Sequence, residues 1–452
     1  MATAIDTRSG PATVQENAIT RFFRATEIDT RLLGMIGALI IIWGGMDLIG
    51  VWKDVGFTLD PARLWNESIF LSSRNLWNLL IQTSVIAVMS TGMVLIIVMR
   101  HIDLSVGSML SFIGVVTGVA QAFWMAPAWG SGHPAIWVVA VVIALALGTL
   151  LGAFNGFLVA YAGIPSFIVT LGGLIVYNGA AFLMARGETV APMDSTFELI
   201  GGNPHQSWLG GTASWALGGL ACLAIASGLV SSRIARQKFN FPQRPMWAEV
   251  LLTLISFGIV LGAVAVVNSY TWPPGVIKRY LTESNLPVPN DLPSIPVGFA
   301  IPMLIAIGVG IVMTFIASRT RFGRYVYAIG GNPEAAELAG VNTRWITLCM
   351  FSLMGLLVGV SSCIAAARLD AASNNLGQSN ELYVIAATVI GGTSLAGGVG
   401  TIYGALLGAL LMQSLQSGMT LLNFDAAVKD VVVGSVLVFA VWLDQLYRRR
   451  SA

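Results

Sequence analysis

The sequence predicts an all-α, polytopic transmembrane helical bundle, and three observations lead to this class. Charged residues make up only 10% of the 452 residues, against about 25% in a typical soluble protein. Hydrophobic residues make up 56% of the chain, and the mean hydropathy is +0.78. The apolar runs do not alternate with polar residues, as the strands of a membrane barrel would. Large soluble enzymes, fibrous proteins and disordered chains are therefore excluded.

The order of the helices follows from apolar runs of about 20 residues, the length that crosses roughly 30 Å of hydrocarbon. The tract from Leu382 to Phe424 holds no charged residue and has room for two helices, so the total is about 10–12 helices. One transmembrane domain, 32–446, is expected between a polar tail, 1–31, and a basic C-terminus, 447–452. The remaining runs are 32–50, 79–99, 104–125, 136–160, 165–184, 214–230, 249–267, 298–317, 346–366 and 430–446.

The middle of the uncharged tract is rich in glycine and cannot hold a stable helix. Residues 391–400 read GGTSLAGGVG. One interpretation is a tight corner between two helices. The other is a broken or re-entrant element, because irregular backbone at membrane depth persists where protein or a cavity satisfies it. Both interpretations stay open at this point.

The basic residues predict the orientation of the chain. Successive loops alternate between the two sides of the membrane. The loops on one side, together with both termini, carry about twice as many Lys and Arg residues as the loops on the other side, and the more basic side is normally cytoplasmic. Both termini are therefore predicted to be cytoplasmic, which requires an even number of crossings. The loop 318–345 falls on the same side.

The predicted spans lack the groups that drive chemistry or proton transport. No central Glu, Lys, Arg or His is found in them, and Asp47, Asp103 and Asp444 lie near span ends, so a proton relay is disfavoured. No Gly-Lys pair forms a phosphate-binding loop, and the three histidines do not have metal-ligand spacing. The net charge of +2 offers no basic field for nucleic acid. We expect no catalytic residue, no metal and no cofactor.

The loop 318–345 contains the signals of a short helix outside the membrane. Asn332 is a good N-cap, and Pro333 suits the first helical position. Glu334 interacts favourably with the helix dipole, and Gly340 can take the left-handed conformation that ends the helix. A helix of about two turns is marginal alone in water. It is either a connector resting on neighbouring helices or a knob that fits a groove on a cytoplasmic partner.

Four motifs in the same order resemble the ribose/xylose-type permeases of ABC sugar importers. The strongest is GRYVYAIGGNPEAA at 323–336, which resembles the coupling-loop signature of that family. The others are HIDLSVGS at 101–108, PSFIVTLG at 165–172 and VIGGTSLAGG at 389–398. The form of the second motif and the extra hydrophobic hairpin at 214–267 make the D-xylose permeases the most similar members.

The resemblance implies a homodimeric permease in the bacterial inner membrane, surrounded by lipid. Such a permease pairs with a cytoplasmic ATP-binding subunit and a periplasmic sugar-binding protein, and it translocates a monosaccharide, here D-xylose or another pentose. A stand-alone ion-coupled secondary transporter or a channel is the alternative. The coupling-loop motif that begins at 323 implies a contact with the ATP-binding subunit, with Arg324 beside it. The contact residues are Asn332, Glu334, Ala335, Ala336, Glu337, Leu338 and Gly340.

A sugar path needs hydroxyl and amide groups rather than charges. The same groups also bond neighbouring membrane helices, so each candidate has a structural interpretation beside the functional one. Asp103 and Ser105 are expected to begin a membrane helix by capping it. Broken backbone near the midplane points to transport sites, which adds two glycines to the candidates. The candidates are Asn155, Thr170, Asn178, Thr388, Gly391, Gly392, Thr393, Ser394 and Gln413.

Overall fold

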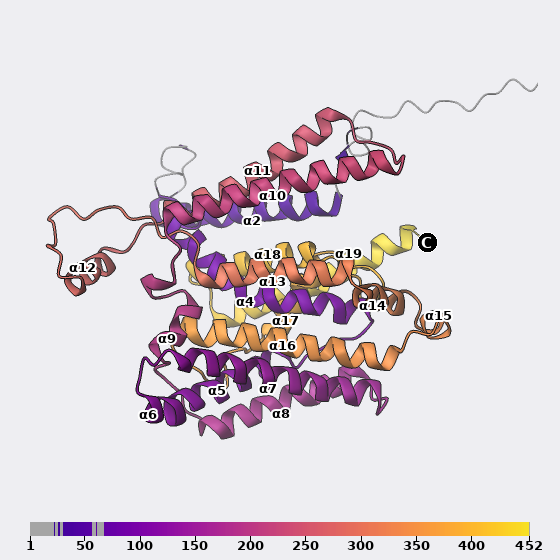
Figure 1. The fold of residues 1–452 in the computed structure, drawn as a ribbon, viewed down its shortest axis with the longest axis horizontal. Coiled ribbons are helices and arrows are strands. Elements are labelled where there is room, and N and C mark those ends of the chain that lie inside the picture. The colour runs from indigo at the N-terminus through magenta and orange to yellow at the C-terminus, as the bar shows by residue number, and fades with distance from the viewer. Residues whose placement is uncertain (1–21, 23–25, 28–29, 57–59, 61–66, 452) are drawn as a thin grey trace, which may run out of the picture.

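The prediction of an all-α bundle is confirmed by the computed structural model of the chain. It describes all residues except 1–21, 23–25, 28–29, 57–59, 61–66 and 452, so most of the predicted tail 1–31 lies outside the described residues. The described residues form helices that lie largely along one axis (Figure 1), with three isolated bridges and no longer strand.

The helices fall into a long and a short class. The long helices are α2 (Thr30–Val55), α4 (Ser73–Val98), α5 (Val106–Val119), α7 (Ala135–Ala160), α8 (Ser166–Ala185), α10 (Gly211–Lys238), α11 (Met246–Ser269), α13 (Ile301–Arg319), α16 (Thr343–Leu369), α18 (Ile402–Leu421) and α19 (Ala426–Ser451). The shorter ones are η1 (Ala120–Met125), α6 (Ala126–Trp129), α9 (Ser195–Glu198), η2 (Leu199–Gly201), η3 (His205–Ser207), α12 (Pro274–Glu283), α14 (Arg321–Gly331), α15 (Pro333–Leu338) and α17 (Asn380–Ile390).

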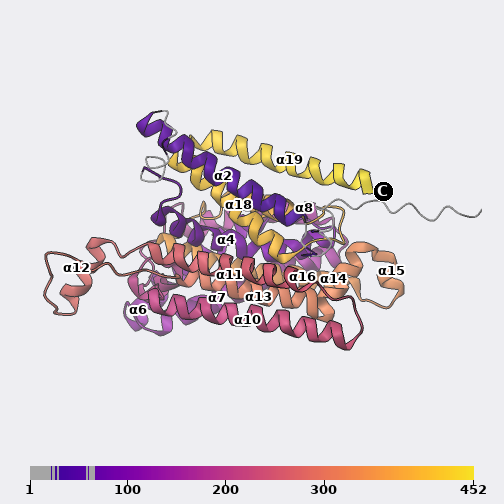
Figure 2. The same cartoon turned by 90° about the horizontal axis from the view of Figure 1, so that it is seen from above.

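Nine helices of the described part are long and apolar enough to cross a membrane. The span predicted at 104–125 is α5 continued by a π-helical turn and α6, which together reach Trp129. The last three helices, α17 to α19, are not among the nine, and α17 is too short to cross alone. The two long ones, α18 and α19, nevertheless run along the bundle beside the others (Figures 1 and 2).

The helix α4 occupies the centre of the bundle. Of its most apolar stretch, 94% is buried inside the molecule, which fits a helix that is apolar on every face. It packs against α13, α16, α17 and α18. The hydroxyls of Thr83, Ser84 and Thr91 bond the backbone of the preceding turn, as Thr83 does to Leu79 O at 2.7 Å. The core is therefore formed by contacts between distant parts of the chain.

The closest helix pair, α7 and α16, is packed through glycines. A Cβ atom on Gly152 would lie 2.2 Å from the Phe351 carbonyl oxygen, and one on Gly355 would lie 2.0 Å from the Gly148 carbonyl oxygen. Small residues at such spacing let membrane helices approach closely. The closely packed pair lies beside the segment that precedes α5, where Asn155 of α7 bonds to Ser105.

The two ends of the bundle differ. The helix α15 and the C-terminus lie at one end, and α12 lies at the other (Figure 1). Glu27, just before α2, accepts hydrogen bonds from Arg236 in the last turn of α10 and from Arg244 in the connection to α11, with shortest distances of 2.9 and 2.7 Å. The start of α2 therefore lies at the same end as α15 and the C-terminus. Figure 2 shows α2, α18 and α19 on one flank and α10 on the other.

Two irregular segments enter the bundle, and neither was predicted as such. Residues 101–105 connect α4 to α5 without helix, and residues 371–379 connect α16 to α17. The interruption predicted at 391–400 is present between α17 and α18. It lies beside the last residue of α4, since Gly398 N–H donates to Val98 O at 2.9 Å, so it forms a corner at the end of the bundle that carries α15.

Candidate functional site

The helix α15 is built as its sequence predicts. The Asn332 side chain accepts a hydrogen bond from Ala335 N–H at 3.0 Å and caps the first turn. Gly340 has a φ of +82°, the left-handed region that favours glycine at a helix end. Of the six helical residues only Ala336 is buried. The Leu338 side chain is 91% exposed, so an apolar group projects from the end of the molecule.

A second helix in the same loop holds α15 in place, and sequence analysis did not predict it. The helix α14 begins at Thr320, whose hydroxyl accepts from Gly323 N–H at 3.2 Å. The Thr320 cap, followed by a strongly amphipathic run, is the signal that would have revealed it. Arg324 lies on the exposed side of α14 and donates only weakly to Arg319 O, at 3.4 Å.

The end of α14 is held against two other segments by the side chains of Arg100 and of its own Tyr327. Arg100, just after α4, donates to Gly330 O at 2.9 Å and to Gly331 O at 2.7 Å. Tyr327 donates to Gly400 O at 2.7 Å. The helix that precedes α15 is thus in contact with the end of α4 and with the corner between α17 and α18.

Among the candidate path residues, Asn155 and Thr170 are buried and bonded to protein groups. Asn155 donates to Ser105 Oγ at 3.1 Å and accepts from the Tyr177 hydroxyl at 2.8 Å. Thr170 bonds to Ser166 O at 2.9 Å. These contacts join α7 and α8 to the segment before α5.

The predicted capping of α5 by Asp103 and Ser105 is wrong, because within the described residues neither side chain accepts a hydrogen bond from an N–H of α5. Asp103 Oδ1 accepts from the N–H of Ser105 at 2.9 Å and from its hydroxyl at 2.6 Å. Ser105 occupies the N-cap position of α5 without a side-chain cap of its own. The pair therefore shapes the entry into α5.

The candidates in the last third of the chain divide into satisfied and unsatisfied groups. Thr388 bonds to Val384 O at 2.7 Å, and Gln413 bonds to Gln82 Oε1 at 2.9 Å. The hydroxyls of Thr393 and Ser394 are buried and have no hydrogen-bond partner among the described residues. The neighbouring glycines Gly391 and Gly392 form the corner, Gly391 against Gly404 and Gly392 with a φ of +87°, and Asn178 on α8 is half-buried.

One ionisable residue inside the bundle escaped sequence analysis, which found no central Glu. Glu381 lies in the first turn of α17 and is half-buried. A Cβ atom on Gly107 of α5 would come within 2.1 Å of Glu381 Oε2, so the carboxylate lies against the start of α5. Its position one residue before the uncharged tract placed it outside the predicted span.

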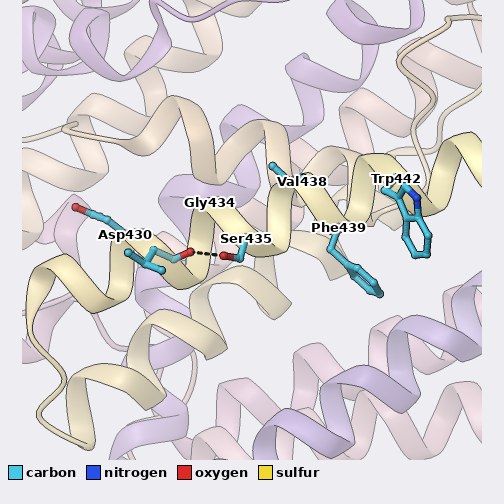
Figure 3. A pocket seen from close by; sticks show the side chains of 7 residues that line it. Asp430, Gly434, Ser435, Val438, Phe439 and Trp442 are labelled. Atoms are coloured by element: carbon cyan, nitrogen blue, oxygen red, sulfur yellow. Dashed lines mark hydrogen bonds between the residues drawn. The ribbon is translucent and has the colours of Figure 1, made fainter.

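An open groove runs along the outer face of α19. Asp430 lies at one end of it and Trp442 at the other, with Gly434 and Ser435 between them (Figure 3). Ser435 uses its hydroxyl on Val431 O at 2.7 Å, so the lining is largely apolar. The exposed side chains repeat at helical spacing and form one continuous stripe.

Comparison with known proteins places the chain in a transport family. A sequence profile described as "Branched-chain amino acid transport system / permease component" matches residues 75–201 and 203–441. These residues include α15, the segments before α5 and α17, and most of α19. No solved structure matches the chain significantly.

Curated relatives cover most of the chain. The xylose transport system permease protein XylH of Escherichia coli (strain K12) is 36% identical over 387 residues, 85% of this chain and 88% of that protein. The ribose import permease protein RbsC of the same strain is 31% identical over 376 residues, 83% and 87% of the two chains. The galactose/methyl galactoside import permease protein MglC of Salmonella typhimurium is 27% identical over 394 residues, 86% and 91%.

The family profile covers far more than half of the sequence, and this family is one of transport permeases rather than of catalytic enzymes. The fold agrees, since the described helices form a multi-pass bundle. The chain belongs to the family of permease components of transport systems to which the branched-chain amino acid permeases give their name.

Proposed function

We propose that this chain is the membrane-spanning permease of an ABC importer that translocates a monosaccharide, D-xylose or another pentose. The xylose and ribose permeases named above support the cargo class. A periplasmic binding protein delivers the sugar, and a cytoplasmic ATP-binding subunit hydrolyses ATP. The chain itself makes and breaks no bonds. It resides in the bacterial inner membrane with both termini in the cytoplasm.

The observation that carries the proposal is the exposed helix α15 and its attachment. Leu338 is an apolar side chain with 91% exposure, flanked by the exposed Glu334 and Glu337. The ATP-binding subunit binds α15 around Leu338. When α15 moves with that subunit, the hydrogen bonds from Arg100 to Gly330 O and Gly331 O transmit the movement to the core. Such coupling requires that the two conformations of the permease bind the partner with different affinity.

The test is the substitution Leu338→Arg, with Glu337→Arg beside it. An anchor residue at the centre of an interface contributes about 2 kcal/mol or more, so affinity for the ATP-binding subunit should fall about thirtyfold. We expect loss of the co-purifying subunit and of uptake of radiolabelled D-xylose.

The matched control is Leu286→Arg, the same change at a half-exposed leucine in the loop after α12, at the other end of the bundle. It should leave uptake intact. Normal uptake by Leu338→Arg would remove the coupling role of α15. Concentration of sugar by the purified chain alone, driven by an ion gradient, would replace the ABC importer with a secondary transporter.

We also propose that two copies pair through the groove on α19. Gly434 and Ser435 are small and exposed at its centre, which permits close helix contact. In a background without Cys222, Cys349 and Cys363, Ser435→Cys should form a disulfide-linked dimer under oxidation. Gly219→Cys, at a similar depth on the exposed face of α10, should not, and equal cross-linking of both would contradict the pairing.

A further inference from the structure

The segment that leads into α17 is unusually rich in amides. Residues 373–381 read SNNLGQSNE, and the last two of them begin α17. Residues 373–379 form a series of turns rather than a helix, with Leu376 N–H donating to Ser373 O at 3.2 Å and Gln378 N–H to Asn375 O at 3.1 Å. Apart from one hydrogen bond from Asn374 to Asn375 Oδ1 at 3.1 Å, the described residues offer these amide side chains no hydrogen-bond partner.

Three hydrogen bonds fix the depth of this segment. Ser361 of α16 bonds to the carbonyl of Val85, which lies near the middle of α4, at 3.1 Å. Its neighbour Ser362 bonds to Leu110 O of α5 at 2.8 Å. Ser111, the next residue of α5, accepts from Gly377 N–H at 2.8 Å. Gly377 therefore lies near the midplane of the bundle, because these bonds connect it to the level of Val85, which is halfway along α4.

The segment has one face against protein and one face open. A Cβ on Gly377 would lie 2.1 Å from Gly107 O, so the backbone of the segment touches α5 directly. Asn375 and Gln378 point away from this contact and are exposed, while Asn380 and Glu381 are half-buried. Gly377 is required at the contact, and the polar residues line the other side.

Lipid cannot surround such a face. Irregular backbone and unpaired amides at membrane depth exist only where protein buries them or where they line a water-filled cavity. A carboxylate at the same depth has the same requirement. The described residues of this chain do not cover Asn375 or Gln378, so the open face borders either a water-filled path or a second protein chain, and the accessibility experiment below distinguishes the two.

We propose that residues 373–381 line the sugar path at the middle of the membrane, and that Asn375, Gln378 and Asn380 bond the hydroxyls of the passing monosaccharide. The proposal rests on the importer function proposed above. Amides donate and accept at once, which matches a hydroxyl that does the same. Glu381, in the first turn of α17, accepts from sugar hydroxyls. From there α17 leads to the corner at 391–400, which is fastened to α14.

The lining is tested by accessibility. Gln378→Cys and, as a control, Gly179→Cys on the outward face of α8 are each introduced without the three native cysteines. A charged, membrane-impermeant thiol reagent is applied to cells with the assembled transporter. Gln378→Cys should react, its modification should block D-xylose uptake, and Gly179→Cys should stay unreactive. A Gln378→Cys that reacts only with a lipid-soluble reagent, or whose modification leaves uptake unchanged, would overturn the lining.

The hydrogen-bonding role is tested by Gln378→Leu, which keeps the size of the side chain and removes its amide. Because Gln378 is exposed and has no partner among the described residues, the complex should assemble normally. Uptake of D-xylose should fall about tenfold, while Gln206→Leu, at an exposed amide of the outer loop, should leave it unchanged. Unaltered uptake by Gln378→Leu would refute the contact.

The two proposals fail separately. If the unsubstituted transporter takes up no monosaccharide, the importer function is refuted. If it takes up D-xylose while both Gln378 variants behave as the unsubstituted protein, only the lining is refuted.

Discussion

At the scale of single residues, two glycines at the end of α14 determine how closely the loop 318–345 approaches the core. Gly330 and Gly331 are neighbours in α14, and Arg100 binds the carbonyls of both. Their surroundings differ sharply. A Cβ on Gly330 would lie 1.9 Å from Val98 O and 2.9 Å from Gly398 N, whereas one on Gly331 would have nothing within 4 Å. Alanine substitutions at the two positions therefore separate the effect of close contact on stability from the effect of helix propensity.

We expect Gly330→Ala to destabilise the protein by about 1–3 kcal/mol through overpacking and to weaken coupling, because α14 must move away from Val98. Gly331→Ala should be neutral or slightly stabilising, since alanine favours a helix. Thermal unfolding in detergent and D-xylose uptake measure both effects. Equal melting temperatures for the two variants would mean that α14 does not touch the core.

The residue scale is also where sequence analysis was least complete. Amphipathic helices and caps are local signals, and Asn332 and Gly340 were correctly placed by them. Burial depends on partners far along the chain. The sequence alone could not tell that Asn155 contacts Ser105 and Tyr177, or that Glu381 lies against Gly107. Polar residues that bond protein and polar residues that face a path look alike in the sequence.

At the scale of elements, the hairpin α10–α11 is fastened to the start of α2 by an ionic cluster. Hydrogen bonds from Arg236 and then Arg244 lower the pKa of Glu27 from 4.5 to about 2. Because the folded-state pKa is depressed, the cluster contributes its full stability above pH 4.5 and loses it as the pH falls toward 2. Glu27 is exposed, so the contribution is about 1 kcal/mol or less.

Glu27→Gln should therefore lower the melting temperature slightly at pH 7, less at pH 3, and make little difference at pH 2 or below. High salt should shrink the difference at pH 7, because screening weakens exposed charge pairs. The control is Glu283→Gln, whose partner Arg279 lies on the same short helix α12 and joins no two elements. A Glu27→Gln effect that grows on acidification would contradict a depressed pKa for this carboxylate.

Element boundaries were predictable to within a few residues where apolar runs were long. The prediction at 136–160 matches α7, and that at 346–366 matches the interior of α16. The span predicted at 104–125 is present as one continuous candidate span, Val106–Trp129, although the π-helical turn within it was not predicted. The prediction was incomplete in the loop 318–345, which holds two helices, and there α14 depends on tertiary contacts such as those of Arg100.

At the scale of the whole molecule, the arrangement predicts a fixed sidedness. The C-terminus, α15 and the turn between α10 and α11 share one end, and α12 lies at the other (Figure 1). In a background without native cysteines, Leu286→Cys should react with an impermeant thiol reagent in intact cells. Leu338→Cys should react only after the membrane is opened. Labelling of Leu338→Cys from outside would reverse the proposed orientation and end the coupling proposal.

The position of α4 has a consequence for biogenesis. This helix leaves the ribosome early, yet the helices that enclose it, α13, α16, α17 and α18, are synthesised only much later. Until then α4 can rest in lipid, because it is apolar on every side. Chains that stop before α16 should therefore enter the membrane but remain open to quality-control proteases, and a translation pause late in the message would prolong that exposure.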